Sequence, residues 1–425
     1  MKKIALKALA AGLLASIAAG NASAVEGPVP TGIPHLNHVY LIMMENHIYG
    51  QVLHNKNAPF TTSYAKSAGL ATKYYAIAHP SLTNYLEVTG GSNFGVLSDI
   101  SPDWHNANCT PNLASGHVAT DNPATSSNIC PISGNGTEAA TPAIDTINET
   151  QGAPGMMNID GVASIPAATN ISGKTIADQL AEHGKLWRSY QESLPARGAN
   201  LVNTSDGVYD NTTDFSKITP ALNPALSSGD MVALYAVKHN PFVYFRSVQE
   251  GSVPNSNLSN SVGFDGAYGL YADLKSAFTG ISAPTLSFIV PNQCNDQHGR
   301  GNAGAFCNFD PDDNGTQAGL NPALIQLGDV ALKKVVTSIK SSPAWKTGKN
   351  AIVVVWDEND YSLAPNKNQV VLIVDTNYGT GGKTSAKFYT HYSLLKTLEA
   401  GFGLPCLNHA CDANVSVMSD LFAAQ

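Results

Sequence analysis

The 425-residue sequence has little of three things: basic charge, long apolar segments and cysteine. It contains 24 Lys and Arg residues against 32 Asp and Glu residues, a net charge of −8. Proteins that bind nucleic acids rely on an excess of basic residues, so this balance argues against nucleic-acid binding. Beyond the first 24 residues no run approaches the roughly 20 apolar residues of a membrane span, so we expect no stable membrane anchor.

The amino terminus has the pattern of a secretory signal peptide. Lys2 and Lys3 precede an apolar segment rich in small residues, and Ala22-Ser23-Ala24 fits the small-x-small cleavage rule. We therefore expect cleavage after Ala24 and a secreted or periplasmic protein. Removing Lys2, Lys3 and Lys7 lowers the basic count from 24 to 21, so the net charge of the mature chain is about −11.

The cysteines are few but even in number. Six are present and no C-x-x-C metal motif occurs, which favours disulfides in an exported chain. Six cysteines allow fifteen pairings, and proximity alone selects among them. It favours three local pairs: Cys109 with Cys130, Cys294 with Cys307, and Cys406 with Cys411.

Four apolar runs of strand length alternate with helical patterns. Continuous apolar runs suit strands that are buried on both faces. The strands are expected at His38–Met44, Thr285–Val290, Ala351–Trp356 and Gln369–Asp375, and the helices at Lys174–His183, Asn321–Ser341 and Tyr392–Ala400. This alternation predicts an α/β fold with a mostly parallel central sheet.

Residues 99–172 differ in composition from the rest. They are rich in Asn, Ser, Thr, Gly and Pro and have few long apolar runs. We interpret them as an irregular insertion over one end of the sheet. The insertion could form part of a lid or a plain surface loop, and the sequence leaves both open.

Polar residues follow three of the expected strands. The strand ends carry Glu45 and Asn46, then Asn292, Asp296 and His298, then Asp357, Glu358, Asn359 and Asp360. In an open α/β sheet, ligands bind outside the carboxyl ends of the strands. One acidic turn is ordinary, but three would bring carboxylates together, and these repel unless a cation lies between them. The pattern therefore indicates a metal site.

The segment AHPSLTNYLEVTGG, residues 78–91, places hydroxyl groups before an amphipathic run that stops at a double glycine. Ser81 or Thr83 could simply cap a short helix. A hydroxyl at a helix amino terminus also lies in a positive field beside free N–H groups, which favours phosphate or an alkoxide. A metal site next to it would make such a hydroxyl a candidate nucleophile.

Together these segments resemble a known family. MMEN after an apolar strand, HPSLTNYLEVTGG, VKHNPF, VPNQCNDQHG, VVWDEND and THYSLLKTLEAGFGLP are similar to the bacterial and fungal phosphoesterase family, from about His35 to Pro405. That family includes secreted acid phosphatases and phosphocholine-type phospholipases C. It is related in fold to the alkaline phosphatase superfamily, which implies a three-layer α/β fold and one catalytic domain over residues 25–425.

The resemblance implies roles for individual residues. Ser81 matches the nucleophile position, with Thr83 where relatives often have proline, and Asn84 would donate to phosphate. The implied metal ligands are Glu45, Asn46, Asp357 and Glu358, with Asp296 in a remaining site whose spacing leaves a second metal open. Glu358 stands where two-zinc relatives have histidine, so the ligands are mostly oxygen. Oxygen ligands suit Ca, Mg or Mn more than Zn.

Four histidines are candidates for the same site. His391 matches a late histidine that binds metal or phosphate in relatives, and His298 or His391 would assist the leaving group. His239 could contact phosphate or pack under a loop. His79 could line the pocket or serve only the turn before Ser81.

The expected function is hydrolysis of small phosphomonoesters, as in an acid phosphatase, by a divalent metal ion and a phosphoserine intermediate. The nearest alternative is a phospholipase C acting on phosphodiester head groups. A non-catalytic exported binding protein on the same scaffold is a third. The sequence leaves the oligomeric state open.

Overall fold

The computed structural model describes residues 26–94, 173–194, 234–276, 283–300, 305–312, 314–359, 368–379 and 381–422, with four two-residue strands between residues 110 and 157. The expected signal peptide, the body of the 99–172 insertion and the pairing of Cys109 lie outside the described residues.

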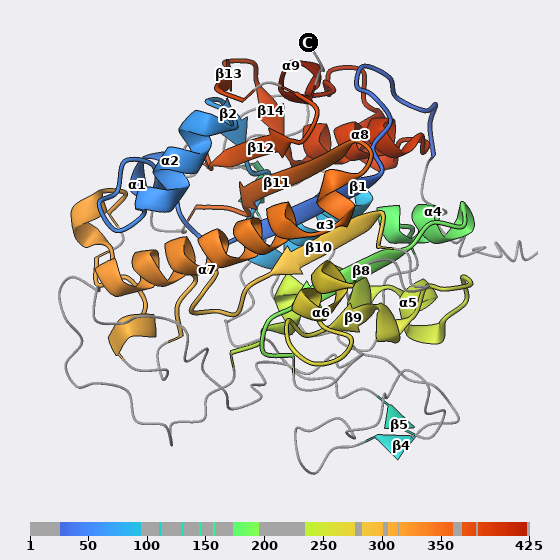
Figure 1. The fold of residues 1–425 in the computed structure, drawn as a ribbon, viewed down its shortest axis with the longest axis horizontal. Helices are drawn as coiled ribbons and strands as arrows, with labels where there is room; N and C mark the ends of the chain where they lie inside the picture. Colours follow the sequence, from blue (N-terminus) through green and yellow to red (C-terminus); the bar gives the residue numbers. More distant parts are fainter. Residues whose placement is uncertain are drawn as a thin grey trace, which may run out of the picture.

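One eight-stranded sheet forms the centre of the molecule (Figure 1), in the order β13-β2-β12-β11-β1-β10-β8-β9. Its strands are β1 (His38–Met44), β2 (Gly69–Ala71), β8 (Trp187–Gln191), β9 (Ser261–Val262), β10 (Leu286–Val290), β11 (Asn350–Trp356), β12 (Leu372–Thr376) and β13 (Lys383–Ser385). Within this sheet β12 alone runs antiparallel to its neighbours. The structure confirms the expected α/β fold with a mostly parallel sheet.

Helices cover both faces of the sheet. They are α1 (Tyr49–Val52), α2 (Pro59–Ser67), α3 (Ser81–Gly90), α4 (Ile176–Glu182), α5 (Arg246–Glu250), α6 (Leu270–Lys275), α7 (Pro322–Ser341), α8 (His391–Phe402) and α9 (Ser419–Phe422). Helix α3 contacts α4 and α8, whereas α7 contacts α2 and α6. Figure 1 shows α7 in front of the sheet and α3 behind it, which makes three layers.

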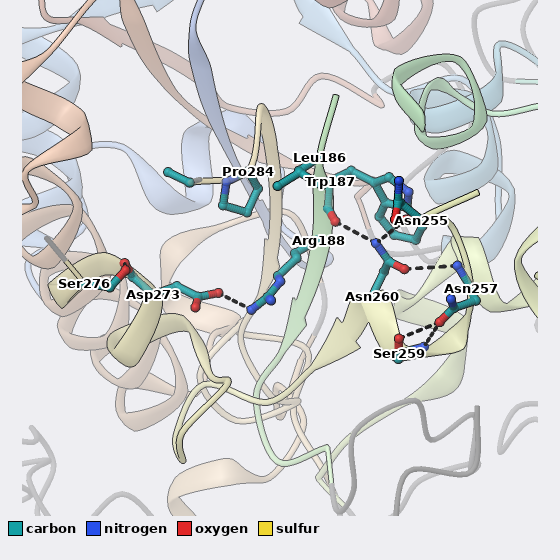
Figure 2. Close-up of a pocket in the computed structure, with 11 residues that line it drawn as sticks. Leu186, Trp187, Arg188, Asn255, Asn257, Ser259, Asn260, Asp273, Ser276 and Pro284 are labelled. Atoms are coloured by element: carbon teal, nitrogen blue, oxygen red, sulfur yellow. Dashed lines mark hydrogen bonds and ion pairs between the residues drawn. The ribbon is translucent and has the colours of Figure 1, made fainter. Parts of the chain in front are cut away.

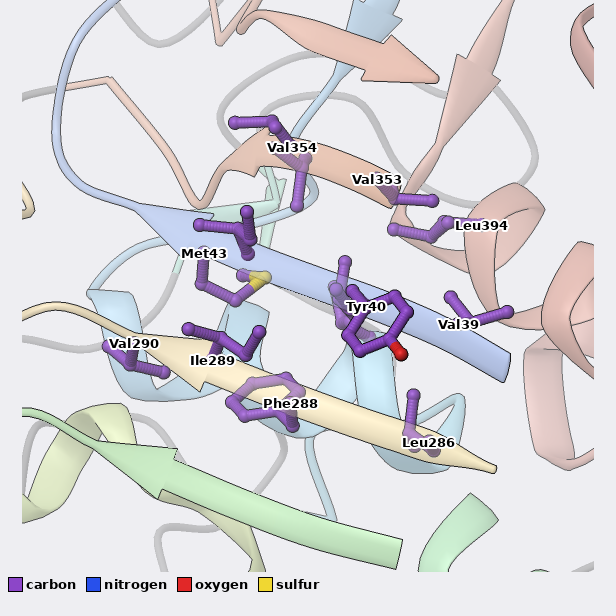
Figure 3. Packing of buried hydrophobic residues seen from close by; sticks show 14 of the residues in the cluster. Val39, Tyr40, Met43, Leu286, Phe288, Ile289, Val290, Val353, Val354 and Leu394 are labelled. Atoms are coloured by element: carbon purple, nitrogen blue, oxygen red, sulfur yellow. The ribbon is translucent and has the colours of Figure 1, made fainter. Parts of the chain in front are cut away.

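The centre of the sheet explains why the three strand ends meet. β1 lies between β10 and β11 and is parallel to both, with Met44 in register with Trp356. Every residue of β10 and β11 is buried. Figure 3 shows part of this core, with apolar side chains from β1, β10, β11 and Leu394 of α8. Continuous apolar strands fit this position because helices cover both faces.

The expected elements lie close to their predicted bounds. Strand β12 begins at Leu372 rather than Gln369, and α8 includes His391 at its first position. Helix α3 ends at Gly90, and the C-cap residue Gly91 has a φ of 70°, the left-handed conformation that glycine adopts most readily. Asn321 caps α7 through its side chain, which accepts a hydrogen bond from the Ala323 N–H.

Two of the three expected disulfides are present, Cys294–Cys307 and Cys406–Cys411. Across the described ranges, no helix combines the length and the apolar character needed to cross a bilayer.

Glu399 in α8 is a buried carboxyl group away from the three strand ends. Its Oε1 accepts a hydrogen bond of 2.9 Å from the Leu407 N–H, and its Oε2 receives none from the described residues. Burial raises the pKa of Glu399 well above its usual value, and the hydrogen bond and Lys396 oppose this only in part. Folding therefore favours the protonated form.

A Glu399→Gln variant should become more stable than the wild type as pH rises. A carboxyl group whose pKa is raised by folding contributes fully below its unfolded pKa and loses that contribution as pH rises through the folded pKa. We expect melting temperatures to agree near pH 4.5 and to differ by roughly 2–4 °C at pH 8 in favour of the variant. If the melting temperatures of the two proteins differed by the same amount at every pH in this range, the raised pKa of Glu399 would be contradicted.

Candidate active site

The three strand ends that carry polar residues meet at one edge of the sheet. The Glu45 N–H donates to the Asp296 carbonyl at 2.9 Å, and the Asn46 N–H donates to Asp357 Oδ1 at 3.1 Å. The side chains of Glu45, Asp296 and Asp357 are each 0% exposed. Asn46 has a φ of 46°, a left-handed conformation that asparagine tolerates better than most residues.

Ser81 lies at the first position of α3, directly against these carboxylates. Its Oγ is 3.0 Å from Glu358 Oε1, 3.2 Å from Glu45 Oε2 and 3.5 Å from Asn46 Oδ1. The Thr83 hydroxyl instead donates to the Pro80 carbonyl at 2.7 Å. The structure therefore places Ser81 among the predicted ligands and gives Thr83 the bond of a local cap.

Helix α3 presents two further side chains on the face of Ser81, at the i+3 and i+4 positions. Asn84 donates to Glu358 Oε2 at 3.2 Å and to the Ala78 carbonyl at 2.8 Å, and its Oδ1 accepts from the Ala78 N–H. The Tyr85 hydroxyl donates to Glu45 Oε1. Sequence reasoning missed Tyr85, although its spacing from Ser81 was a usable signal.

His79 is part of this arrangement rather than only of the turn before Ser81. Its Nδ1 is 2.6 Å from Glu358 Oε2, and both side chains are buried. Glu358 thus contacts three side chains from the segment 79–84: His79, Ser81 and Asn84.

The nitrogen-bearing side chains of His239 and Lys238 lie on the other side of the carboxylates. His239 Nε2 is 3.3 Å from Glu45 Oε1, and its Nδ1 is 3.4 Å from Asp296 Oδ2. The neighbouring Lys238 is 4% exposed, with its Nζ 3.3 Å from His298 Nε2. Sequence reasoning overlooked Lys238, although it adjoins His239 in the VKHNPF motif. A buried lysine here adds a fixed positive charge where an anion can bind.

His391 lies beneath the site, with both ring nitrogens occupied. Its Nε2 is 2.6 Å from the Asp357 carbonyl and its Nδ1 is 2.8 Å from the Tyr74 hydroxyl. Burial lowers the pKa of His391 to about 4, so the ring is neutral. His391 thus contacts the backbone of a predicted ligand, and its expected role toward the leaving group remains a prediction.

The carboxylates are destabilised by one another and by burial. Burial first, then the charges of Asp357 and Asp296, raise the pKa of Glu45 well above its usual value, and Lys238 opposes this. Burial also raises the pKa of Asp296 well above normal and that of Asp357 to about 6. Hydrogen bonds and a nearby cation both stabilise the ionised form of such groups.

The donor atoms fit a divalent metal ion with oxygen ligands. Ser81 has one hydroxyl proton but three acceptors within 3.5 Å, so its hydroxyl donates to only one of them at a time. Asp357 Oδ2 is buried and receives no hydrogen bond from the described residues. Glu45, Asn46, Asp357 and Glu358 would hold the ion, and such a set suits Ca, Mg or Mn.

A different grouping among the described residues, Glu45, His239 and His298, has ligand atoms that all lie within 4.8 Å of one another. Its imidazoles would suit Zn. However, the Lys238 ammonium lies 3.3 Å from His298 Nε2, and its charge would repel a divalent ion there. The oxygen-rich grouping remains our prediction for the metal site.

A cavity of about 200 Å³ lies away from the candidate active site (Figure 2). It is bordered by Trp187 at the start of β8 and by Pro284 before β10, at the opposite end of the sheet from Asp296. Its polar side chains pair with one another: Arg188 with Asp273, and Asn257 with Ser259. None of the predicted site residues lines it.

Comparison with known proteins agrees with the chemistry of the site. The sequence pattern of the Phosphoesterase family matches residues 50–307 and 314–405, which is most of the chain. The chain therefore belongs to the Phosphoesterase family. This membership confirms the resemblance and the expected class of enzyme, a hydrolase of phosphate esters.

Relatives with named activities include two phosphatases. A phosphatidylinositol-3-phosphatase of Mycobacterium tuberculosis is 24% identical over 409 residues, covering 95% of this chain and 89% of the relative. A phosphate-repressible acid phosphatase of Penicillium chrysogenum is 26% identical over 356 residues, 83% of this chain but 57% of the relative. This chain thus spans little more than half the length of the fungal protein.

Among solved structures, an alkaline phosphatase superfamily protein of Vibrio parahaemolyticus is similar with a TM-score of 0.41 and 10% identity. The similarity covers 89% of this chain and 69% of that one.

Divalent metal should stabilise the protein through Glu358. Chelation leaves the buried carboxylates to repel one another, and saturation with a cation that binds only the folded state restores stability. We expect a rise in melting temperature of roughly 5 °C on adding Ca, Mg or Mn to the chelated protein.

A Glu358→Gln variant should lose most of that rise. Glu182→Gln is the matched control, because Glu182 lies on the surface in an ion pair with Lys174. An equal metal-induced rise in the Glu358 variant would refute the assigned ligand set.

Proposed function

We propose that this phosphoesterase is a secreted, metal-dependent phosphatase that hydrolyses phosphomonoesters through a phosphoserine on Ser81. The contact of Ser81 Oγ with Glu45, Asn46 and Glu358 at 3.0–3.5 Å carries the proposal. It combines a hydroxyl nucleophile, metal-ligating oxygens and the positive end of a helix, which phosphoryl transfer uses together.

The metal, when bound to Glu45, Asn46, Asp357 and Glu358, supplies positive charge that favours the serine alkoxide and the phosphate oxygens. The protein adds the fixed charge of Lys238 and an N–H group of His239 on the other side of the carboxylates. These groups bind the phosphoryl oxygens and hold the ester in line with Ser81.

The first step forms a bond from Ser81 Oγ to phosphorus and breaks the bond from phosphorus to the ester oxygen. The Ser81 proton passes to Glu358, whose other oxygen contacts His79 Nδ1. His298, at 8% exposure the most accessible of the site histidines, donates a proton to the leaving alkoxide. His391 is a positioning residue, because its ring nitrogens contact Tyr74 and Asp357.

The second step reverses these roles. Water attacks the phosphoserine and gives its proton to the now neutral His298, the bond from phosphorus to Ser81 Oγ breaks, and Glu358 returns the proton to Ser81. Inorganic phosphate leaves and the enzyme is restored.

A phosphomonoester substrate is favoured over a phosphodiester. The relatives with named activities are phosphatases, one of a phosphoinositide and one an acid phosphatase. No geometric feature of the described residues favours a phosphodiester. A non-catalytic binding protein would not need Ser81 against three acceptors.

We also propose export and a single catalytic domain over residues 25–425. Disulfides Cys294–Cys307 and Cys406–Cys411 are compatible with an oxidising compartment. All three strand ends of the site come from one continuous sheet.

Ser81→Ala should abolish turnover, whereas Thr83→Val should leave it almost unchanged. Loss of the nucleophile should lower kcat/KM for p-nitrophenyl phosphate by on the order of 10³-fold or more. Thr83→Val removes only a cap hydrogen bond, which costs about 1 kcal/mol of stability. The measurements are steady-state kinetics and thermal unfolding. Substantial turnover by Ser81→Ala would exclude the proposed nucleophile.

Rapid acid quenching during turnover should trap a phosphoryl group on Ser81. Peptide mass spectrometry would locate it, and the Ser81→Ala protein is the control. Phosphorylation of a different residue in active wild-type enzyme would overturn the mechanism.

A further inference from the structure

Phe309 is an unusual surface residue. Most large apolar side chains of the described residues are buried, but the Phe309 side chain is 51% exposed. Tyr268 is 55% exposed, and its carbonyl accepts a hydrogen bond from Arg188 near the start of β8, at the other end of the sheet. Phe309, in contrast, lies beside the candidate active site.

A row of aromatic rings connects Phe309 to the carboxylates. The Tyr85 ring stacks on His239 with centroids 5.3 Å apart, His239 meets His298 at 5.5 Å, and His298 meets Phe309 at 6.0 Å. Exposure rises along the row, from 2% for His239 to 8% for His298 and 51% for Phe309. The row therefore leads outward from the Glu45 side chain to solvent.

The backbone around Phe309 is fixed on several sides. The Cys294–Cys307 disulfide ties the segment to the loop that carries Asp296 and His298. Asn321 Nδ2 donates to the carbonyls of Asn308 and Ala305 at 2.8 and 3.0 Å. These contacts hold the ring in place without covering it.

Neighbouring residues add further contacts that fix the backbone around Phe309. Asp310 Oδ2 is 3.0 Å from His47 Nε2, and Asp310 Oδ1 accepts from the Asn321 N–H at 2.7 Å. Gly299 approaches so closely that a Cβ on it would lie 3.2 Å from the Phe309 Cα. An exposed aromatic ring on a fixed backbone is suited to binding, because little conformational entropy is lost when a ligand packs on it.

We infer that Phe309 is a specificity-determining residue that packs against the non-phosphate part of the ester. This inference rests on the proposed function, in which His298 protonates the leaving group. A group attached to the ester oxygen would leave the site past His298, where the Phe309 ring lies. The enzyme therefore discriminates in favour of phosphomonoesters whose leaving group is aromatic or otherwise apolar next to the phosphate.

The test compares esters with apolar and polar leaving groups in metal-loaded, full-length enzyme. Phe309→Ala should lower kcat/KM for p-nitrophenyl phosphate by about 5- to 10-fold and that for glycerol 2-phosphate by less than about twofold. Each substrate is compared only with its own wild-type value, because the two leaving groups differ in intrinsic reactivity. Phe309→Trp should keep the wild-type kcat/KM for p-nitrophenyl phosphate, because it keeps an aromatic ring at this position.

Inhibitor binding measures the packing of a ligand on Phe309 without the hydrolysis step. Phe309→Ala should raise the inhibition constant of phenylphosphonate by about 5- to 10-fold and leave that of methylphosphonate and inorganic phosphate unchanged within about twofold. Tyr268→Ala is the matched control, since it removes an equally exposed ring at the opposite end of the sheet and should change none of these values. Melting temperatures verify that each variant is folded.

The outcomes are distinguishable. Active wild-type enzyme with equal losses on both esters, or with no loss on the aryl ester, would overturn the role of Phe309 and leave the proposed function intact. Wild-type enzyme that hydrolyses neither ester with any of the divalent metals would overturn the proposed function, and the role of Phe309 with it.

Discussion

Repulsion among buried carboxylates is the constraint on which the rest of the site depends. Glu45, Asp296 and Asp357 are fully buried, and burial together with mutual repulsion raises the pKa of Glu45 well above normal. Such a cluster either takes up protons or is stabilised in its ionised form by nearby positive charge and hydrogen bonds. Lys238 supplies part of that charge, and the oxygen-rich grouping around Ser81 fits a divalent ion that would supply the remainder.

The position of β1 in the sheet brings the carboxylates together and holds them. Because β1 pairs with β10 on one side and with β11 on the other, the segments after all three strands are directed to one edge. The backbones then lock together: Glu45 donates to the Asp296 carbonyl, and Asp357 donates to the Met44 carbonyl. The carboxylates are thus held by strand ends and their backbone hydrogen bonds, which keeps them in place despite their repulsion.

The sequence predicted the elements whose apolar pattern is strong. Strands β1, β10 and β11 follow continuous apolar runs, and their polar ends met as parallel pairing requires. Strand β8 was missed because its sequence WRSYQ is polar, although Ser189 and Gln191 are buried and hydrogen-bonded to Asn240 and the His239 carbonyl. Tertiary partners of this kind leave no periodic signal in the chain. The same holds for His391, whose match to a family position could not show that both ring nitrogens face Tyr74 and the Asp357 backbone.

The Cys294–Cys307 disulfide joins two loops that perform different tasks. One carries Asp296 and His298 and belongs to the chemistry, whereas the other carries Phe309 and faces the solvent. Cleavage of this bond would leave the strand ends and Ser81 in place but remove one of the constraints on the segment that presents the ring. The compartment in which the chain folds would then determine its selectivity among substrates separately from its ability to cleave them. Enzyme produced in a reducing cytoplasm would be a less discriminating catalyst than the same chain folded after export.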